Sequence, residues 1–240
     1  MTTIIDHLQA HRSYRDFDEN YELPEADLRS ILKAARQAPS WMNGQFYSIL
    51  VIRDQEKRRQ LVEWNPGNPH MLNSSIFVMF IADFQRTSAV SQHYQQEYQV
   101  TGNLDALITA TTDAALAAEN CLIAAESLGL GGCAIGSIRK HSQEIIDLFE
   151  LPEYTLPLFG LAIGKPIVEM RVKPRLPEQA VIHYDRYQPL NYQDILEYDQ
   201  TMKKFGEARE TKLWSQKFAD YFEKSTIPNY EKVLKNQKFL

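Results

Sequence analysis

The segment 113–128, DAALAAENCLIAAESL, constrains the fold of this chain more than any other part of it. Its few polar residues leave a helix that is apolar on nearly all sides, and its many alanines allow other elements to approach it closely. A helix that is apolar all round needs cover on every face, so it lies in the centre of a core or at a subunit interface. The sequence therefore predicts a central helix over Asp113–Leu128, either in the centre of the core or at a subunit interface.

Shorter apolar patterns predict the elements around this helix. Apolar residues at helical spacing predict a short helix leading into His11 and a second helix between Pro24 and Pro39. Strands are expected in the β-rich apolar runs 48–52, 76–82 and 156–163, and another directly after the glycines at 129–132. A helix over 142–149 and charged helices after Tyr192, with Ile195, Leu196, Met202 and Phe205 as their apolar anchors, complete the pattern. Helices first, strands interspersed and charged helices last indicate an α+β fold.

Composition limits the classes of protein to which the chain can belong. Its 240 residues suit one or two domains, and 44% hydrophobic residues are typical of a packed globular protein. A net charge of −5 argues against non-specific nucleic-acid binding. No apolar run approaches the roughly 20 residues that span a bilayer, and no signal peptide is visible. The two cysteines, Cys121 and Cys133, lie in apolar surroundings and are expected to be buried thiols in a cytoplasmic protein.

Two compact basic clusters are the strongest candidates for a ligand site. One is His11-Arg12-Ser13-Tyr14-Arg15, and the other is Lys173-Pro174-Arg175, in which the proline stiffens the backbone between two charges. Together they offer the donors that a doubly charged phosphate, or a phosphate with a polar ring, requires. Either cluster alone is more often part of an ordinary solvated surface.

Other motifs mostly exclude chemistry. The glycines of Gly129–Ala134 match the dinucleotide pattern G-x-G-x-x-A, but a helix precedes them where that fingerprint requires a strand. No serine lies in a G-x-S-x-G setting and the six histidines show no metal-ligand spacing, so no hydrolase and no metal site is expected. Trp41 lies in the loop 39–45 between a helix and a strand, where ligands commonly bind. Gly136 and Ser137 follow a buried strand and could offer backbone N–H groups to a flat ligand.

The order of five short motifs resembles the FMN-dependent nitroreductase superfamily, and most closely its subgroup of NADPH-dependent oxygen-insensitive nitroreductases and flavin reductases. The motifs are HRSYR at 11–15, APS at 38–40, AAESLGLGG at 124–132, LPLFGLAIG at 156–164 and KPRLP at 173–177. The resemblance implies a sandwich with a central antiparallel-rich mixed sheet flanked by helices, and a domain-swapped type of homodimer. It implies one domain over residues 1–240, in which 193–240 form a charged helical C-terminal extension.

The resemblance also implies the residues that bind FMN. His11, Arg12 and Ser13 would lie at the phosphate together with Lys173 and Arg175, and Arg15 would lie at the pyrimidine edge of the ring. Negative charge develops at that edge on reduction, so the arginine has an electrostatic role and no side-chain acid or base is needed. The remaining candidates are Ser40 from a facing loop, Asn68 at the ring or ribityl chain, and backbone N–H groups of Ile135, Gly136 and Ser137 near N5 and O4.

The chain departs from this pattern in two places. Trp41 and Met42 replace small serines that line the substrate side in relatives. The segment after Tyr198, where relatives hold the NADPH 2′-phosphate, is shorter here, with Arg209 and Lys203 as candidates and Lys204 and Lys212 as substitutes. The expected activity is ping-pong transfer of hydride from NADPH through FMN to nitroaromatics, quinones or flavins. The alternatives are a reductase that supplies free reduced FMN and a flavin-binding regulatory module without turnover.

Overall fold

The computed structural model describes residues 3–206, 211–224 and 227–240. It divides into two compact units, one formed by Met1–Met170 with Ile227–Leu240 and the other by Arg171–Thr226. The charged extension expected from residue 193 begins inside a helix of the second unit, and its last residues belong to the first unit. A division into domains at 193 therefore stays a prediction, and each unit is described by itself.

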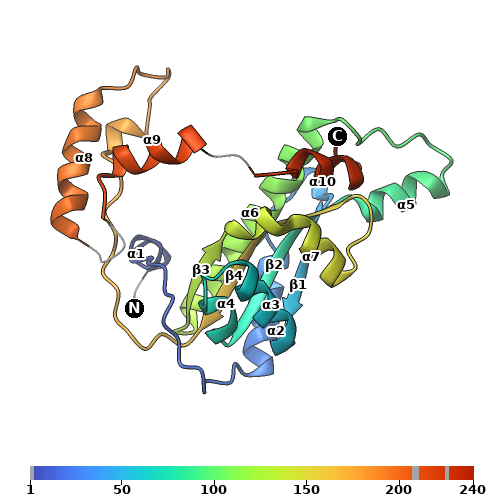
Figure 1. Ribbon diagram of the computed structural model, residues 1–240, viewed down its shortest axis with the longest axis horizontal. Coiled ribbons are helices and arrows are strands. Elements are labelled where there is room, and N and C mark those ends of the chain that lie inside the picture. The colour runs from blue at the N-terminus through green and yellow to red at the C-terminus, as the bar shows by residue number, and fades with distance from the viewer. Residues whose placement is uncertain (1–2, 207–210, 225–226) are drawn as a thin grey trace. The chain divides into compact units, whose positions relative to one another are not determined.

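A four-stranded sheet is the centre of the first unit (Figure 1). The strands are β1 (Tyr47–Ile52), β2 (Ile76–Asp83), β3 (Gly131–Ile135) and β4 (Thr155–Gly164), in the order β1-β2-β4-β3. All three pairings are antiparallel, so the described sheet is antiparallel throughout where a mixed one was expected. Three of the predicted strands agree with these bounds to within one residue, and the fourth, β3, begins two residues before its predicted start. Gly131 and Gly132 lie in β3 itself, which confirms that these glycines belong to a helix–strand junction and not to a dinucleotide fingerprint.

β2 is apolar in nearly every position, so both of its faces must be covered. Helices pack on both faces of the sheet. Val78, Phe80 and Ala82 point to one face and Phe77 and Met79 to the other, as the two-residue period of a strand requires. The first unit contains these helices: α1 (Ile4–Gln9), α2 (Glu25–Arg36), α3 (Gln55–Trp64), α4 (His70–Asn73), α5 (Gln85–His93), α6 (Leu104–Ser127), α7 (Ser142–Phe149) and α10 (Tyr230–Asn236). Short 3₁₀ turns, η1 (Trp41–Asn43) and η2 (Ser137–His141), follow α2 and β3.

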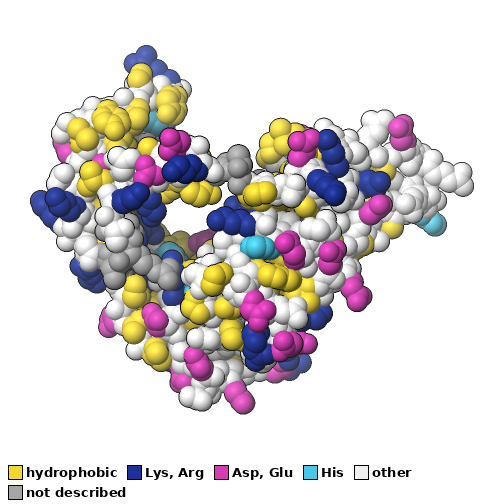
Figure 2. Space-filling model, in the orientation of Figure 1, with side chains coloured by type: hydrophobic (Ala, Val, Ile, Leu, Met, Phe, Trp, Pro, Cys, Tyr) yellow, Lys and Arg dark blue, Asp and Glu magenta, His cyan; other side chains and the backbone are white. Residues whose placement is uncertain are grey.

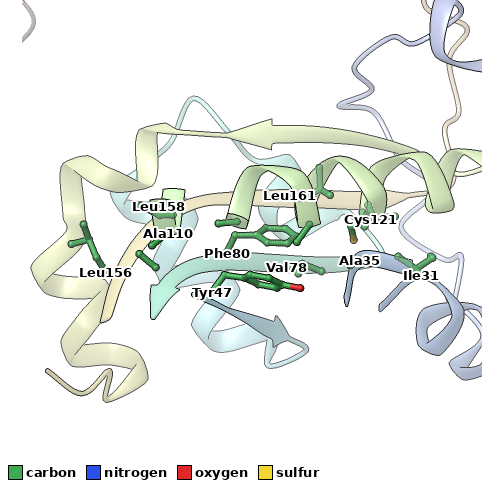
Figure 3. Close-up of a cluster of buried hydrophobic side chains, with 14 of the residues drawn as sticks. Ile31, Ala35, Tyr47, Val78, Phe80, Ala110, Cys121, Leu156, Leu158 and Leu161 are labelled. Atoms are coloured by element: carbon green, nitrogen blue, oxygen red, sulfur yellow. The ribbon is translucent and has the colours of Figure 1, made fainter. Parts of the chain in front are cut away.

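The central helix α6 begins nine residues before the predicted position. Its N-cap is Asn103, whose side chain accepts a hydrogen bond from the backbone N–H of Ala106. The predicted start at Asp113 was wrong because the added turns contain three threonines, whose branched side chains favour helices less than alanine does. Figure 3 shows Ala110 and Cys121 of this helix against Phe80 and Val78 of the sheet.

Only one stripe of α6 is buried in the single chain. The alanines at 110, 114, 117 and 125 and Cys121 are fully buried, and burial raises the pKa of the Cys121 thiol to about 12. Cys133 is buried as well, so the predicted burial of both cysteines is confirmed. By contrast, Ile108 is 56% and Leu116 is 39% exposed. The apolar surface of the helix thus extends beyond the part that this chain covers. Its place at a dimer interface stays a prediction.

The second unit is built from α8 (Tyr192–Phe205), α9 (Trp214–Lys224) and the turn η3 (Glu178–Ala180). Ile195 and Met202 are buried anchors of α8 as predicted, but Leu196 is 44% exposed and is not an anchor. Tyr198 takes that role instead, since its ring packs edge-on against Trp214 with the centroids 5.6 Å apart. Nearby, buried Asp199 accepts hydrogen bonds from the backbone and the hydroxyl of Ser215.

Two surface properties follow from the described residues. Acidic and basic side chains are interspersed on the face shown in Figure 2. Among the helices whose residues are described, none is both long and apolar enough to cross a membrane.

Candidate cofactor site

The first basic cluster lies along the end of the sheet where β3 begins. Tyr14 donates its backbone N–H to the carbonyl of Gly132 at 3.0 Å, and Phe17 forms a β-bridge with Pro166 just after β4. Gly131 has no side chain, and a Cβ there would collide with the ring of Tyr14. These contacts fix the backbone of residues 11–17 against a rigid element, which is what a precise binding site needs.

Within this cluster, His11 and Arg12 are oriented by neighbours from the same unit. His11 Nδ1 lies 2.7 Å from a carboxylate oxygen of Glu126 in the last turns of α6, and His7 Nε2 lies 3.5 Å from the other oxygen. Arg12 donates to the hydroxyl of Tyr14 at 2.9 Å and to the carbonyl of Ala10 at 2.8 Å. Glu126 was missed as a site residue, although it lies inside the AAESLGLGG motif.

Arg15 differs from these two residues. Its side chain is half-buried, and it has neither an ion pair nor a hydrogen bond within the portion of the chain that the structure describes. A partly buried cation is normally paired, because removing it from water costs free energy that a partner offsets. Arg15 is therefore suited to an anionic or strongly polar ligand group.

Asn68 and Ser137 come together although they are 69 residues apart. The Asn68 amide, in the turn between α3 and α4, donates to the Ser137 hydroxyl at 3.1 Å. Ser137 opens η2 directly after β3, while the side chain of Ile135 is buried and leaves only its backbone for a ligand. Gly136 lies between them, where a Cβ would come within 3.2 Å of the Arg139 guanidinium. The strand end and the Asn68 turn thus form one polar corner.

A buried arginine holds the Asn68 turn in place. Arg58 is 1% exposed and donates to the carbonyl of Met71 at 2.7 Å and to the hydroxyl of Ser74 at 2.9 Å, with a further bond to the Ser74 carbonyl. Burial lowers the pKa of Arg58 to about 10, so it is still charged at neutral pH. Arg58 was not among the predicted residues, since no local pattern marks an arginine as buried.

The loop after α2 presents Trp41 and Met42, which are 59% and 81% exposed. Ser40 stabilises this loop by accepting the backbone N–H of Gln45 at 3.2 Å. Buried Asp113 of α6 accepts the backbone N–H of Trp41 at 3.0 Å and that of Phe46 at 3.1 Å. The Ser40 hydroxyl thus accepts a hydrogen bond within its own loop. Its contact with a ligand stays a prediction.

The second basic cluster belongs to the second unit. Arg175 donates to the backbone carbonyl of Lys173 at 2.7 Å, and the hydroxyl of Tyr198 donates to the carbonyl of Pro174 at 2.9 Å. The α8 helix therefore holds this segment, as α6 holds the first cluster. Lys203 and Lys204 are exposed in the last turn of α8, and Lys212 pairs with Asp220 at 2.5 Å. Arg209 lies outside the described residues.

Replacing Arg58 with methionine should leave two buried carbonyls without donors, at a cost of about 2–4 kcal/mol in the free energy of unfolding. Arg59→Met is the matched control: this neighbour is 50% exposed and pairs with Glu56 at the surface, so it should cost at most about 0.5 kcal/mol. Urea unfolding of both variants measures the difference. Equal losses would show that Arg58 does not hold the turn.

Comparison with known proteins agrees with this geometry over the whole chain. Residues 8–165 match the Nitroreductase family and residues 173–240 match the C-terminal domain of the Nitroreductase family. The chain is 35% identical to an FMN reductase [NAD(P)H] of Bacillus subtilis, over 100% of this chain and 98% of that protein. It is 34% identical to an oxygen-insensitive NADPH nitroreductase of Salmonella typhimurium, over 95% of this chain and 92% of that protein.

Solved structures give the same result. Nitroreductase A of Vibrio parahaemolyticus superposes with a TM-score of 0.90 at 33% identity, covering 99% of this chain and 98% of the other. The NADPH:FMN oxidoreductase of Vibrio harveyi, solved with NAD+, gives 0.88 at 32% identity, with 99% and 98% covered. The sequence motifs, the antiparallel sheet with its flanking helices and these matches lead to one conclusion: the chain belongs to the nitroreductase family.

Proposed function

We infer that this protein is an FMN-dependent NAD(P)H oxidoreductase that reduces nitroaromatics, quinones or flavins. Relatives that match nearly its whole length bear the names FMN reductase, NADPH-flavin oxidoreductase and NADPH nitroreductase. The observation in the structure that carries the proposal is Arg15, a half-buried cation without a partner in the described chain, beside a backbone held rigidly to the sheet. Bound FMN would supply the chemistry, which is two-electron transfer from reduced nicotinamide to the oxidant.

The two basic clusters would hold the FMN phosphate. The proposed donors are His11, Arg12, Ser13, Lys173 and Arg175. Glu126 orients the His11 ring, and Tyr198 fixes the backbone between the second pair of charges. Charge-assisted bonds of this kind contribute about 1.5–3 kcal/mol each, so both clusters acting on one phosphate would retain the cofactor tightly.

The ring would lie beside the polar corner of the first unit. Arg15 would face its pyrimidine edge, where a fixed positive charge favours the negative charge of the reduced form. Asn68 would bond the ring or ribityl chain, and the backbone of Ile135, Gly136 and Ser137 would meet N5 and O4. Ser40 would reach the site from the facing loop.

The proposal includes a cytoplasmic homodimer. The exposed apolar side of α6, including Ile108 and Leu116, is the surface that a second copy would cover. Small-molecule oxidants are the expected substrates, with Trp41 and Met42 on the side where they bind. NADPH is the expected reductant, with Lys203 near its 2′-phosphate and Arg209 as a further candidate outside the described residues. No nucleic-acid or membrane partner is part of the proposal.

Steady-state kinetics test this function against its two alternatives. NADPH oxidation with a quinone acceptor should give parallel double-reciprocal lines, because both substrates use one open face in turn. Turnover that is much faster with added free FMN than with quinone or nitrofuran would favour a reductase that supplies reduced flavin. Absence of NADPH oxidation by protein that holds FMN would favour the regulatory module and contradict the proposal.

Arg15→Ala tests the proposed electrostatic role. Loss of one charge-assisted bond to the reduced ring, about 1.5–3 kcal/mol, should lower the two-electron midpoint potential by about 30–60 mV. FMN retention should stay close to normal, because the phosphate contacts remain. Arg29→Ala, which removes an exposed arginine of α2, should leave the potential unchanged. Loss of FMN with an unchanged potential in the remaining holoenzyme would make Arg15 a phosphate ligand instead.

A further inference from the structure

Asp113 is a buried carboxylate that binds the two ends of one exposed loop. Asp113 is 2% exposed. Its two carboxylate oxygens accept separate hydrogen bonds, one from the backbone N–H of Trp41 at 3.0 Å and one from that of Phe46 at 3.1 Å. No salt bridge to a lysine or arginine accompanies it among the residues the structure describes. A buried charge needs compensation, and here the two backbone donors supply it.

The loop between these two bonds has an unfavourable backbone. Met42, Asn43 and Gln45 have φ angles of 48°, 57° and 53°, in the left-handed region that residues with a Cβ rarely adopt. Such conformations persist where surrounding contacts enforce them, and they are concentrated at binding sites. Asp113 joins the loop to the long helix α6 at both ends and so enforces this conformation.

The same two N–H donors belong to the aromatic residues that form the wall of a pocket. Trp41 and Phe46 line a cavity of about 300 Å³ together with Phe84 and Tyr98. The ring centroids of Trp41 and Phe46 are 6.0 Å apart, and those of Phe46 and Phe84 are 4.9 Å apart. The position of the indole is therefore set by the backbone that Asp113 holds.

We propose that Asp113 is the positioning residue that sets selectivity among aromatic oxidants, by holding the 41–46 loop in the conformation that presents Trp41. The inference rests on the proposed function in one respect, namely that Trp41 lies on the oxidant side. Asp113 itself does not touch the cofactor or the substrate. Its effect is on which oxidant rings the indole accepts.

Asp113→Asn tests this role with little change of shape. The amide nitrogen then faces one of the two N–H donors, so one end of the loop is released. The ratio of kcat/KM between a two-ring and a one-ring quinone should change about tenfold. This is the low end of the discrimination that a single hydrophobic contact provides. In a ping-pong reaction kcat/KM for the oxidant reports the oxidative half-reaction alone, so this ratio does not depend on the rate of flavin reduction by NADPH. Glu63→Gln, an equal charge change on an exposed position of α3, should leave the ratio unaltered.

A spectroscopic measurement separates this proposal from the proposed function. With Trp64 and Trp214 replaced by phenylalanine, Trp41 is the remaining tryptophan. Acrylamide quenching of its emission should change when Asp113→Asn is added to that protein, whether or not either form oxidises NADPH. Unchanged quenching together with an unchanged quinone ratio would overturn the role of Asp113. Absence of NADPH oxidation in the parent protein would overturn the proposed function alone.

Amide hydrogen exchange in the unmutated holoenzyme covers the case in which Asp113→Asn does not fold. The Trp41 and Phe46 amides should exchange much more slowly than the Met42 amide, which lies between them in the same loop. Equally fast exchange at all three positions would show that the carboxylate does not hold the loop, and would contradict the proposal without any variant.

Discussion

The close packing of α6 on the sheet is the constraint on which the rest of the first unit depends. Its contact stripe is alanine and cysteine, so the helix axis can approach the strands more closely than leucines would allow (Figure 3). Three polar side chains of the same helix then reach segments of the N-terminal half. Asp113 binds the 41–46 loop, the Asn120 amide donates to the carbonyl of Ala34 in α2 at 3.1 Å, and Glu126 contacts His11. One rigid helix therefore positions the 41–46 loop, α2 and the His11 ring.

This arrangement explains how a site can be precise although its residues lie on loops. The His11–Arg15 segment, the Asn68 turn and the 41–46 loop are each tied to a helix or strand by hydrogen bonds. Arg58 bonds to the helix that follows the Asn68 turn, and Asp113 bonds to both ends of the 41–46 loop. Both are charged side chains buried against backbone groups. Such fixed dipoles and charges do not reorganise when charge develops on a ligand, which is the condition for electrostatic stabilisation.

The sequence predicted the parts of the fold that have a local signal. The uniformly apolar run at 76–82 marked a strand buried on both faces, and the helix over 142–149 was placed correctly. The start of α6 was wrong because threonines obscure its first turns, and Leu196 was wrong because periodicity does not tell which side of a helix finds a partner. Asp113 and Arg58 were missed as site residues because their bonds link positions 72 and 13 residues apart.

The visible spectrum of the purified protein tests the central claim most directly. The account predicts a yellow protein with flavin absorbance bands, about one FMN released per chain on denaturation, and bleaching of the bands by NADPH without oxygen. A colourless protein that takes up no added FMN would contradict it, because the basic clusters and Arg15 would then have no flavin to hold.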